Sequence, residues 1–453
     1  MSNRFLALAL AATCAATAMW GQSGNLRAGA ARVDITPPAN ELPIPLVGSG
    51  LPVLASGRMP QFVGVHDPLY ARVLLLDDGS TQAAIAIVDV SEIPKHEEFH
   101  RTVAQALGIP EANVILAASH THSEPTMYYR EGPQQTLPND RSTSSSPQQD
   151  AQWAREIDRV IQGTAQAARQ AKAQLRPARV AFSRGQAWVN VHDGETGTGD
   201  PTGPSDKSLD VMRVDGVDGV PIALLVDYGV PSSVMLHNIT REDGAEISGD
   251  LLGVAAQLIE KQAENGPVVL FAAGADGDQR PLLRSTPVAV GKLPSIKEGD
   301  AAWDMVDVLS SILAKSVLSV SDGMKPGDGA VKISAAAKTI SCATKKQSFG
   351  KTAADSTVAD GPPAQIPLNL IRIGDIAVAG VGGNVGSQIN VKFKAASPLA
   401  HSTMITVTSG SVGYILDDAT YANPGQIKTG SLKAGCADKA IVQGLVDMIQ
   451  AKP

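Results

Sequence analysis

The 453-residue sequence has few aromatic residues, only three cysteines and no excess of basic charge. Phe, Trp and Tyr make up 4% of it, so a core has to be built from aliphatic side chains, and the 43% of hydrophobic residues supply enough of them. A formal net charge of −7, without a Lys/Arg cluster, argues against a nucleic-acid-binding protein. No apolar run after the N-terminal segment is long enough to cross a bilayer, which argues against a transmembrane protein.

The N-terminal segment has the three parts of a secretory signal peptide. A short basic start at residues 1–4 precedes an apolar run at 5–12, and the small residues Ala16 and Ala18 then provide a cleavage site. The apolar run is too short to span a membrane. We therefore expect residues 1–22 to be a signal peptide and the mature protein to be secreted or periplasmic.

Two cysteines, Cys342 and Cys436, remain once that segment is removed. In an oxidising compartment they can form a disulfide that ties a late segment to the C-terminal one. Two buried free thiols are the alternative, and the sequence leaves both open.

Strand and helix patterns alternate along the chain. Short β-branched and apolar runs predict strands, and apolar residues at helical spacing predict helices between them. This alternation predicts an α/β (α+β layered) protein with mixed β-sheets flanked by helices. The polar run 133–150 has too little apolar surface to fold alone, so we predict a mobile surface loop there, followed by a helix from about residue 151.

Two histidines follow one of the predicted strands. The run 113–117 predicts a buried strand, and His120 and His122 come just after it. Residues at i and i+2 of a strand point to the same face, so the two imidazoles are candidates for a metal or proton-transfer site. A pair of histidines hydrogen-bonded into a loop is the alternative.

Other motifs carry less information. Asp276 and Asp278 lie in a glycine-rich acidic loop after the strand at 267–272, where the alternative to a functional role is loop capping. His192 and Asn190 are candidates for the lining of a pocket. The sequence has no G-x-S-x-G context, which argues against a serine triad. It also has no G-x-G-x-x-G that opens a helix after a strand, which argues against nucleotide binding.

Five stretches, taken in order, resemble the neutral/alkaline (non-lysosomal) ceramidase family. They are Ala-Gly-Ala-Ala-Arg-Val-Asp-Ile-Thr-Pro-Pro, Val-His-Asp-Pro-Leu-Tyr-Ala-Arg, Ser-His-Thr-His-Ser, Ile-Ser-Gly-Asp and Phe-Ala-Ala-Gly-Ala-Asp-Gly-Asp. The resemblance implies a neutral-ceramidase-like domain over residues 28–450, whose C-terminal part, 330–450, completes the site. It also implies hydrolysis of an N-acyl amide bond of a small-molecule or lipid-like substrate, with a zinc ion in the pocket.

The resemblance assigns roles to some residues. The family holds its zinc with the first histidine of the His-x-His segment, a later histidine, a glutamate and a tyrosine. His120 and Tyr414 match the first ligand and the tyrosine, and His122 matches the histidine that stabilises the oxyanion. Zinc polarises a carbonyl or activates water, while fixed donors hold the oxyanion.

Three positions depart from the family pattern. Pro231 stands where the later histidine is expected, and His237 is the nearest replacement. Asn384 stands in place of the glutamate, and a neutral amide is a poor substitute for a carboxylate ligand. Arg280 occupies the position of the family's serine. There it would repel a metal unless Asp276 or Asp278 pairs with it, or it could bind an anionic group.

The first hypothesis is a secreted amide hydrolase that uses metal-assisted attack of water. Two alternatives stay open: a family member without its metal site that acts as a binding protein, and a metal-free acid–base enzyme that uses His122 and Arg280. The sequence does not predict an oligomeric state. The candidate residues are His122, Arg280 and Asp278 for catalysis, Asn384, Asn190 and His192 for substrate binding, and His120, His237 and Tyr414 for zinc.

Overall fold

The computed structural model of the chain describes residues 25–45, 61–125, 147–193, 199–236, 244–262, 266–285, 301–348, 357–422 and 432–451. The predicted signal peptide and His237 lie outside these residues, as does most of the predicted loop 133–150. The last four residues of that predicted loop are helical, because α2 spans Pro147–Ala173, with Pro147 and Asp150 in a first turn that suits both residue types. Within the described ranges, no helix has the length and apolar character needed to cross a membrane.

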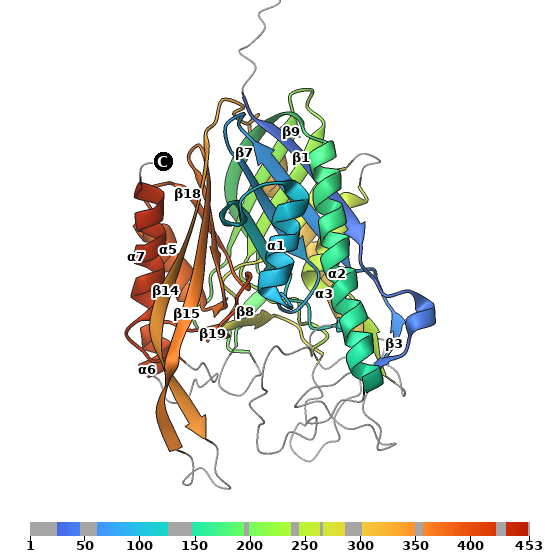
Figure 1. The fold of residues 1–453 in the computed structure, drawn as a ribbon, viewed down its shortest axis with the longest axis vertical. Helices are drawn as coiled ribbons and strands as arrows, with labels where there is room; N and C mark the ends of the chain where they lie inside the picture. The colour runs from blue at the N-terminus through green and yellow to red at the C-terminus, as the bar shows by residue number, and fades with distance from the viewer. Residues whose placement is uncertain are drawn as a thin grey trace, which may run out of the picture.

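Eight strands form the main sheet, in the order β12-β10-β9-β7-β1-β4-β5-β6 (Figure 1). Only two residue pairs join β7 to β1, so the sheet consists of two four-stranded halves. The strands are β1 (Arg27–Asp34), β4 (Tyr70–Asp77), β5 (Gln82–Val88), β6 (Val114–Ala118), β7 (Arg176–Gln186), β9 (Ser208–Gly216), β10 (Pro221–Tyr228) and β12 (Val268–Ala273). The β5–β6 and β10–β12 pairs are parallel and the others antiparallel, which confirms the predicted mixed sheet.

The alternation of side chains along these strands places a hydrophobic core on each face of the sheet. In β4, Leu74 and Leu76 pack in a core that also receives β10 and β12, while Val73 and Leu75 pack in a separate core with helices. Both faces of a strand such as β4 are therefore buried, which explains its nearly continuous apolar sequence.

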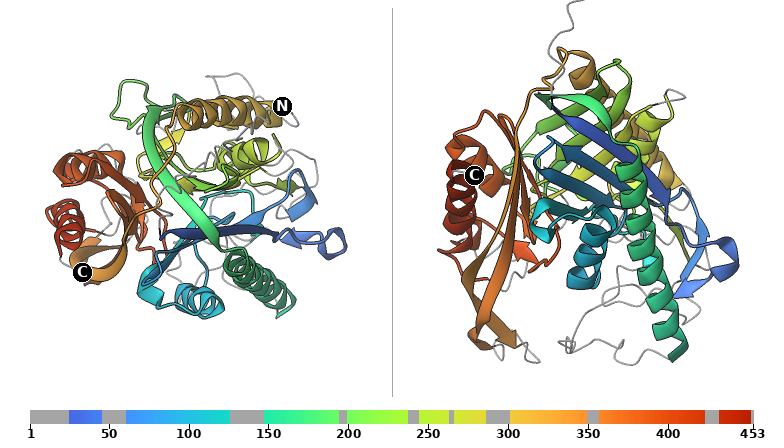
Figure 2. Two further views of the ribbon diagram at one scale, coloured as in Figure 1. Left: turned by 90° about the horizontal axis from the view of Figure 1, so that it is seen from above. Right: turned by 45° about the horizontal axis from the view of Figure 1, so that its top comes forward.

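Helices cover the outer face of each half. Figure 2 shows one helix pair on one side of the sheets and a second pair on the opposite side. The first pair is α1 (His96–Leu107) and α2, and the second is α3 (Asp250–Glu260) and α4 (Ala301–Asp322). Gly108 ends α1 in the left-handed conformation, a usual helix stop.

The C-terminal part forms a further layer, drawn in orange and red in Figure 1. Its sheet has the order β14-β15-β16-β18, with two helices against it. The elements are β14 (Ile333–Ser348), β15 (Thr357–Ile373), β16 (Ile376–Val381), β18 (His401–Ile405), α5 (Ser387–Ala396), the short α6 (Asp418–Ala422) and α7 (Ala437–Gln450). Cys342 of β14 and Cys436 before α7 form a disulfide, which decides between the two alternatives that the sequence left open.

Small elements complete the chain. A three-stranded sheet and two strand pairs lie outside the large sheets. They are β2 (Ile44–Pro45) with β3 (Gln61–Val65) and β11 (Ala245–Ile247), β8 (Asn190–His192) with β13 (Gln279–Pro281), and β17 (Asn384–Val385) with β19 (Tyr414–Ile415); the 3-10 helices are η1 (Ala39–Glu41) and η2 (Glu111–Asn113). The two strand pairs bring most of the predicted site residues together.

Candidate active site

His120 lies two residues beyond the end of β6, in the left-handed backbone conformation with φ of 59°. A strand's two-residue alternation therefore does not extend to it, and our argument that His120 and His122 share a strand face is wrong. The two rings nevertheless lie near each other, with centroids 5.0 Å apart and planes tilted by 39°. The loop, not the strand, sets this arrangement.

The segment after β18 brings the ends of β6 and β12 together. The backbone N–H of Thr406 donates to the carbonyl of Ala273 at the end of β12, and the N–H of Ala118 at the end of β6 donates to the carbonyl of Val407. One short segment thus bonds to two strands from different halves of the main sheet. The loop after β6, which contains His120, and the loop after β12, which contains Asp276, therefore begin close together.

His120 and Asp276 form a buried pair. Nδ1 of His120 lies 2.6 Å from Oδ2 of Asp276, and their side chains are 8% and 0% exposed. A carboxylate accepts but does not donate, so in the neutral ring Nδ1 carries the proton and Nε2 is the basic nitrogen. The other oxygen of Asp276, Oδ1, is buried and makes no hydrogen bond within the described part of the chain.

His122 is fixed through its backbone. Its N–H donates to the carbonyl of Ser232. In the same turn, the N–H groups of Val234 and Met235 donate to the carboxylate of Asp250. Burial raises the pKa of that carboxyl to about 6, although the bonds from the turn oppose the shift. The turn therefore holds His122 against the start of α3.

Asp278 anchors a helix. Its Oδ1 accepts the N–H of Ser387, the first residue of α5, at 2.7 Å, and its Oδ2 accepts the hydroxyl of Ser387 at 2.9 Å. Burial raises the pKa of Asp278, and the bonds from Ser387 and Gln279 lower it. These contacts are those of a helix N-terminal cap supplied by another segment, so they account for Asp278 without a catalytic role.

Arg280 lies on β13, which pairs with β8 so that Arg280 is opposite Val191. Its side chain is buried, which lowers its pKa, and the charge of Asp193 opposes that shift. The carboxylate whose charge acts on Arg280 is thus Asp193, whereas the sequence offered Asp276 or Asp278 as its partner.

His192 and Asn190, both on β8, are also buried. The amide of Asn190 donates to the carbonyls of Asp206 and Gly229 and accepts from Lys207 and Tyr228. This set of bonds supports a structural role for Asn190. The substrate-binding role of either residue stays a prediction.

Asn384 and Tyr414 are direct neighbours in the parallel β17–β19 pair. Asn384 is buried, and its Oδ1 has no hydrogen-bond partner in the described ranges. The backbone carbonyl oxygen of Asn384 would lie 2.2 Å from a Cβ added to Gly277. Only glycine therefore lets the acidic loop approach β17 this closely. The acidic loop that contains Asp276 therefore packs against the β17–β19 pair.

The hydroxyl of Tyr414 lies in a field of several charges. Burial raises its pKa, the negative charges of Asp276 and Asp193 raise it further, and Arg284 lowers it. The phenol is therefore protonated at neutral pH and can donate a hydrogen bond. Arg284 itself donates from Nε and Nη2 to the carbonyl and hydroxyl of Ser233.

The donors present do not fit the zinc site that the resemblance implies. Among the described residues, no group of three His, Cys, Asp or Glu side chains is placed to hold a metal ion. Asn384 offers a neutral oxygen where a carboxylate is expected. His237, the third ligand that we predicted, lies outside the described residues.

Sequence reasoning missed two contributors to this site. Arg284 and Asp193 belong to no motif, and only the fold brings them beside Tyr414. Asp276 had been weighed as a partner for Arg280 or as a loop cap, whereas the structure pairs it with His120. Figure 1 shows β8 and β19 at the same end of the sheets. Asp193 directly follows β8, and Tyr414 is the first residue of β19.

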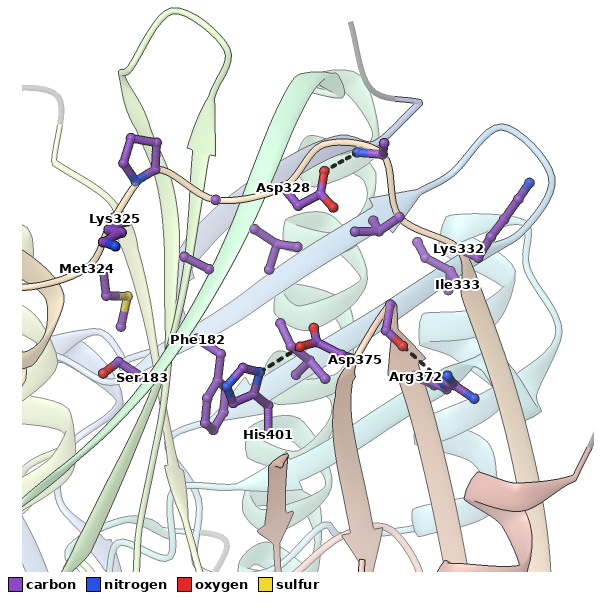
Figure 3. A pocket seen from close by; sticks show the side chains of 18 of the residues that line it. Phe182, Ser183, Met324, Lys325, Asp328, Lys332, Ile333, Arg372, Asp375 and His401 are labelled. Atoms are coloured by element: carbon purple, nitrogen blue, oxygen red, sulfur yellow. Dashed lines mark hydrogen bonds and ion pairs between the residues drawn. The ribbon is translucent and has the colours of Figure 1, made fainter. Parts of the chain in front are cut away.

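A large groove lies far from these residues (Figure 3). It has a volume of about 1220 Å³ and is lined by the starts of β16 and β18, whereas the candidate site lies beyond their opposite ends. Figure 3 shows His401 in an ion pair with Asp375, at 3.0 Å, and in ring contact with Phe182. The groove thus contains none of the predicted site residues.

Comparison with known proteins supports the resemblance that the sequence motifs carry. No protein-family model matches the chain. Neutral ceramidase B of Dictyostelium discoideum is 26% identical over 245 residues, which are 49% of this chain and 32% of that protein. The match thus spans about a third of the relative's length.

Solved structures show the fold. The crystal structure of neutral ceramidase from Pseudomonas aeruginosa matches 94% of this chain and 74% of its own, with a TM-score of 0.70 and 18% identity. A structure described as ceramidase complexed with C2 matches the same shares, with a TM-score of 0.69 and 17% identity. The predicted α/β class and the resemblance to neutral ceramidases are therefore confirmed, while identity this low carries no activity across.

Proposed function

We propose that this protein hydrolyses an N-acyl amide bond, with His120 and Asp276 activating the attacking water. The observation that carries the proposal is the 2.6 Å contact between Nδ1 of His120 and Oδ2 of Asp276 in a buried site beside Tyr414. The similarity to neutral ceramidases supports the choice of an amide as the bond that is cleaved.

The proposed reaction begins with water. Nε2 of His120 takes a proton from a water molecule as its oxygen attacks the carbonyl carbon of the amide. Asp276 holds the ring in the tautomer with a basic Nε2 and stabilises the imidazolium that forms. The tetrahedral intermediate then breaks its C–N bond, and the imidazolium returns the proton to the leaving nitrogen, so that a carboxylic acid and an amine result.

The oxyanion needs donors that are already oriented. Tyr414 keeps its phenolic proton, because burial and two nearby carboxylates raise its pKa, so it is one such donor. His122, whose ring centroid lies 5.0 Å from that of His120, is the second, the role that the resemblance implies for it. Arg280 adds positive charge, while Asn384 and His192 line the substrate side.

The proposal is tested by assaying the purified protein against N-acyl sphingosines and N-acyl amino acids. We expect release of free fatty acid and amine, and its loss in His120→Ala. Arg101→Gln is the matched control, since the side chain of Arg101 is 53% exposed on α1 and its ion-pair partner is the exposed Glu111, which is not a site residue. If neither substrate class is hydrolysed by a folded protein, the proposal fails and the alternative of a binding protein is favoured.

A zinc-dependent version of this reaction remains the competing hypothesis. It requires His237 to join His120 and Tyr414. The neutral amide of Asn384, in place of a carboxylate ligand, supports the metal-free version. Secretion of the protein stays a prediction as well, and cleavage after about residue 22 would be detected by N-terminal sequencing of exported protein.

A further inference from the structure

Arg284 is a partly buried cation beside the candidate active site. Its Nε donates to the carbonyl of Ser233 at 3.1 Å and its Nη2 to the hydroxyl of Ser233 at 2.9 Å, and both acceptors are neutral. Among the residues that the structure describes, no carboxylate forms a hydrogen bond or ion pair with it. Buried charges in proteins are normally paired, because desolvation without a counter-ion is unfavourable.

A second guanidinium lies close enough to act on the first. Arg280, four residues earlier on β13, is 5% exposed. Burial lowers the pKa of Arg284, and the positive charge of Arg280 lowers it further, while Asp193 opposes both effects. Burial lowers the pKa of Arg280 too. An anion bound between the two guanidiniums would offset the cost of burying them and the repulsion between their positive charges.

Both arginines belong to the candidate active site. The turn that holds Arg284 also holds His122, because the carbonyl of Ser232 accepts the N–H of His122 and the next residue, Ser233, binds Arg284. The charge of Arg284 also acts on the hydroxyl of Tyr414, whose pKa it lowers. An anion bound by Arg284 would therefore lie beside the two proposed oxyanion donors.

We infer that Arg284 and Arg280 bind an anionic group of the substrate, so that the compounds hydrolysed here carry a carboxylate next to the scissile amide, as N-acyl amino acids do. This inference rests on the proposed function for the identity of the amide. A guanidinium presents two parallel N–H groups that match a carboxylate, and Arg284 has further N–H groups besides the two that Ser233 uses.

The test compares two substrates that share an acyl chain and an amide. N-octanoylglycine carries the carboxylate, and N-octanoylethanolamine has a neutral hydroxyl in its place. We expect kcat/KM to be about 10- to 100-fold higher for N-octanoylglycine, the range expected for a charge-assisted bond. Arg284→Gln should lose this preference through a higher KM, and Arg284→Lys, which keeps the charge but not the fork, should retain part of it.

Binding is measured separately from turnover. Calorimetric titration of N-octanoylglycine into His120→Ala and into His120→Ala/Arg284→Gln needs no catalysis, and we expect about 10-fold or more weaker binding to the second protein. Arg101→Gln is the control for a general loss of positive charge, and thermal unfolding of each variant checks its fold.

The outcomes separate this inference from the proposed function. Equal hydrolysis of both compounds, unchanged by Arg284→Gln, would overturn the inference and leave the amide hydrolase standing. No hydrolysis of either compound, with Arg284-dependent binding of N-octanoylglycine alone, would leave the anion site standing and overturn the hydrolase. Equal binding of N-octanoylglycine to the two His120→Ala proteins would overturn the anion site directly.

Discussion

Nδ1 of His120 lies 2.6 Å from Oδ2 of Asp276, although 156 residues separate them in the sequence. The contact exists because the segment after β18 bonds to the ends of both β6 and β12. The histidine is thereby held in one tautomer by a buried carboxylate, an arrangement that suits a general base.

The activity should not depend on zinc. Asn384 stands in place of a carboxylate, so the site lacks a negative ligand that would help to hold the ion. We expect elemental analysis to find well under one zinc per chain and dialysis against a chelator to leave turnover unchanged. Stoichiometric zinc that disappears in both His120→Ala and His237→Ala, but not in His192→Ala, would establish the competing mechanism.

Asp278 should matter for stability more than for chemistry. Asp278→Ala removes both acceptors of Ser387 at the start of α5 and should lower the free energy of unfolding by about 1–3 kcal/mol in urea titrations. Asp278→Asn keeps an acceptor for the N–H of Ser387, so we expect nearly parental stability and activity from it. A large fall in kcat in a stable Asp278→Asn protein would show that Asp278 is catalytic after all.

Asp227 should make the protein less stable as the pH rises from 4 to 7. The hydroxyl of Thr403 lies within hydrogen-bond distance of carboxylate oxygens of both Asp227 and Asp210, but its single proton can serve only one. Burial and the charge of Asp210 raise the pKa of Asp227 to about 7, while Lys394 and the bond from Thr403 lower it and Asp206 raises it. Between pH 3.8 and 7 the folded state therefore binds more protons than the unfolded state, so stability falls with rising pH.

Two Asp→Asn variants test whether ionisation of Asp227 lowers stability as the pH rises. Asp227→Asn imitates the neutral acid and should raise the free energy of unfolding at pH 8 by about 1–3 kcal/mol, with little effect near pH 4. Asp210→Asn should lower stability at pH 8, because Asp210 lies within 3.0 Å of Lys394 and is the carboxylate partner of Arg184. Destabilisation at pH 8 by both variants would contradict the assignment of the proton to Asp227.

The Cys342–Cys436 bridge should stabilise the C-terminal layer. It closes a loop with a sequence separation of 94 residues between β14 and the start of α7. Replacing both cysteines by Ala should cost about 2–4 kcal/mol of unfolding free energy. A reducing agent should weaken the parent by a similar amount and leave the double variant unchanged; equal sensitivity of the two proteins would contradict the prediction.

Most regular elements were predictable from the sequence, because their local patterns agree with their burial. The strand β6 and the helix α3 follow apolar runs of the right length and period. The long β14–β15 hairpin is only partly predictable, because Gly361, Pro362 and Pro363 argue against a strand. Pro362 and Pro363 lie where the register between β14 and β15 shifts, and this part of β15 does not pair with β16, so both prolines are tolerated.

The composition of the site was predictable to a smaller extent. The structure pairs Asn384 with Tyr414 and His120 with Asp276, while the site roles that the resemblance implies for these residues stay predictions. The His120–Asp276 pair depends on a left-handed residue and on hydrogen bonds from a segment more than 120 residues away, and no local pattern encodes either. Arg284 was missed for the same reason, because its position follows from a turn that α3 fixes.

The most direct test of the account is kcat for amide hydrolysis by Asp276→Asn. An asparagine can donate to Nδ1 and so favour the tautomer whose Nε2 carries the proton, which cannot accept one from water. We predict that kcat falls by about 10²- to 10⁴-fold while the thermal unfolding temperature stays near that of the parent. A folded Asp276→Asn protein whose kcat stays within a few-fold of the parent would contradict the central claim.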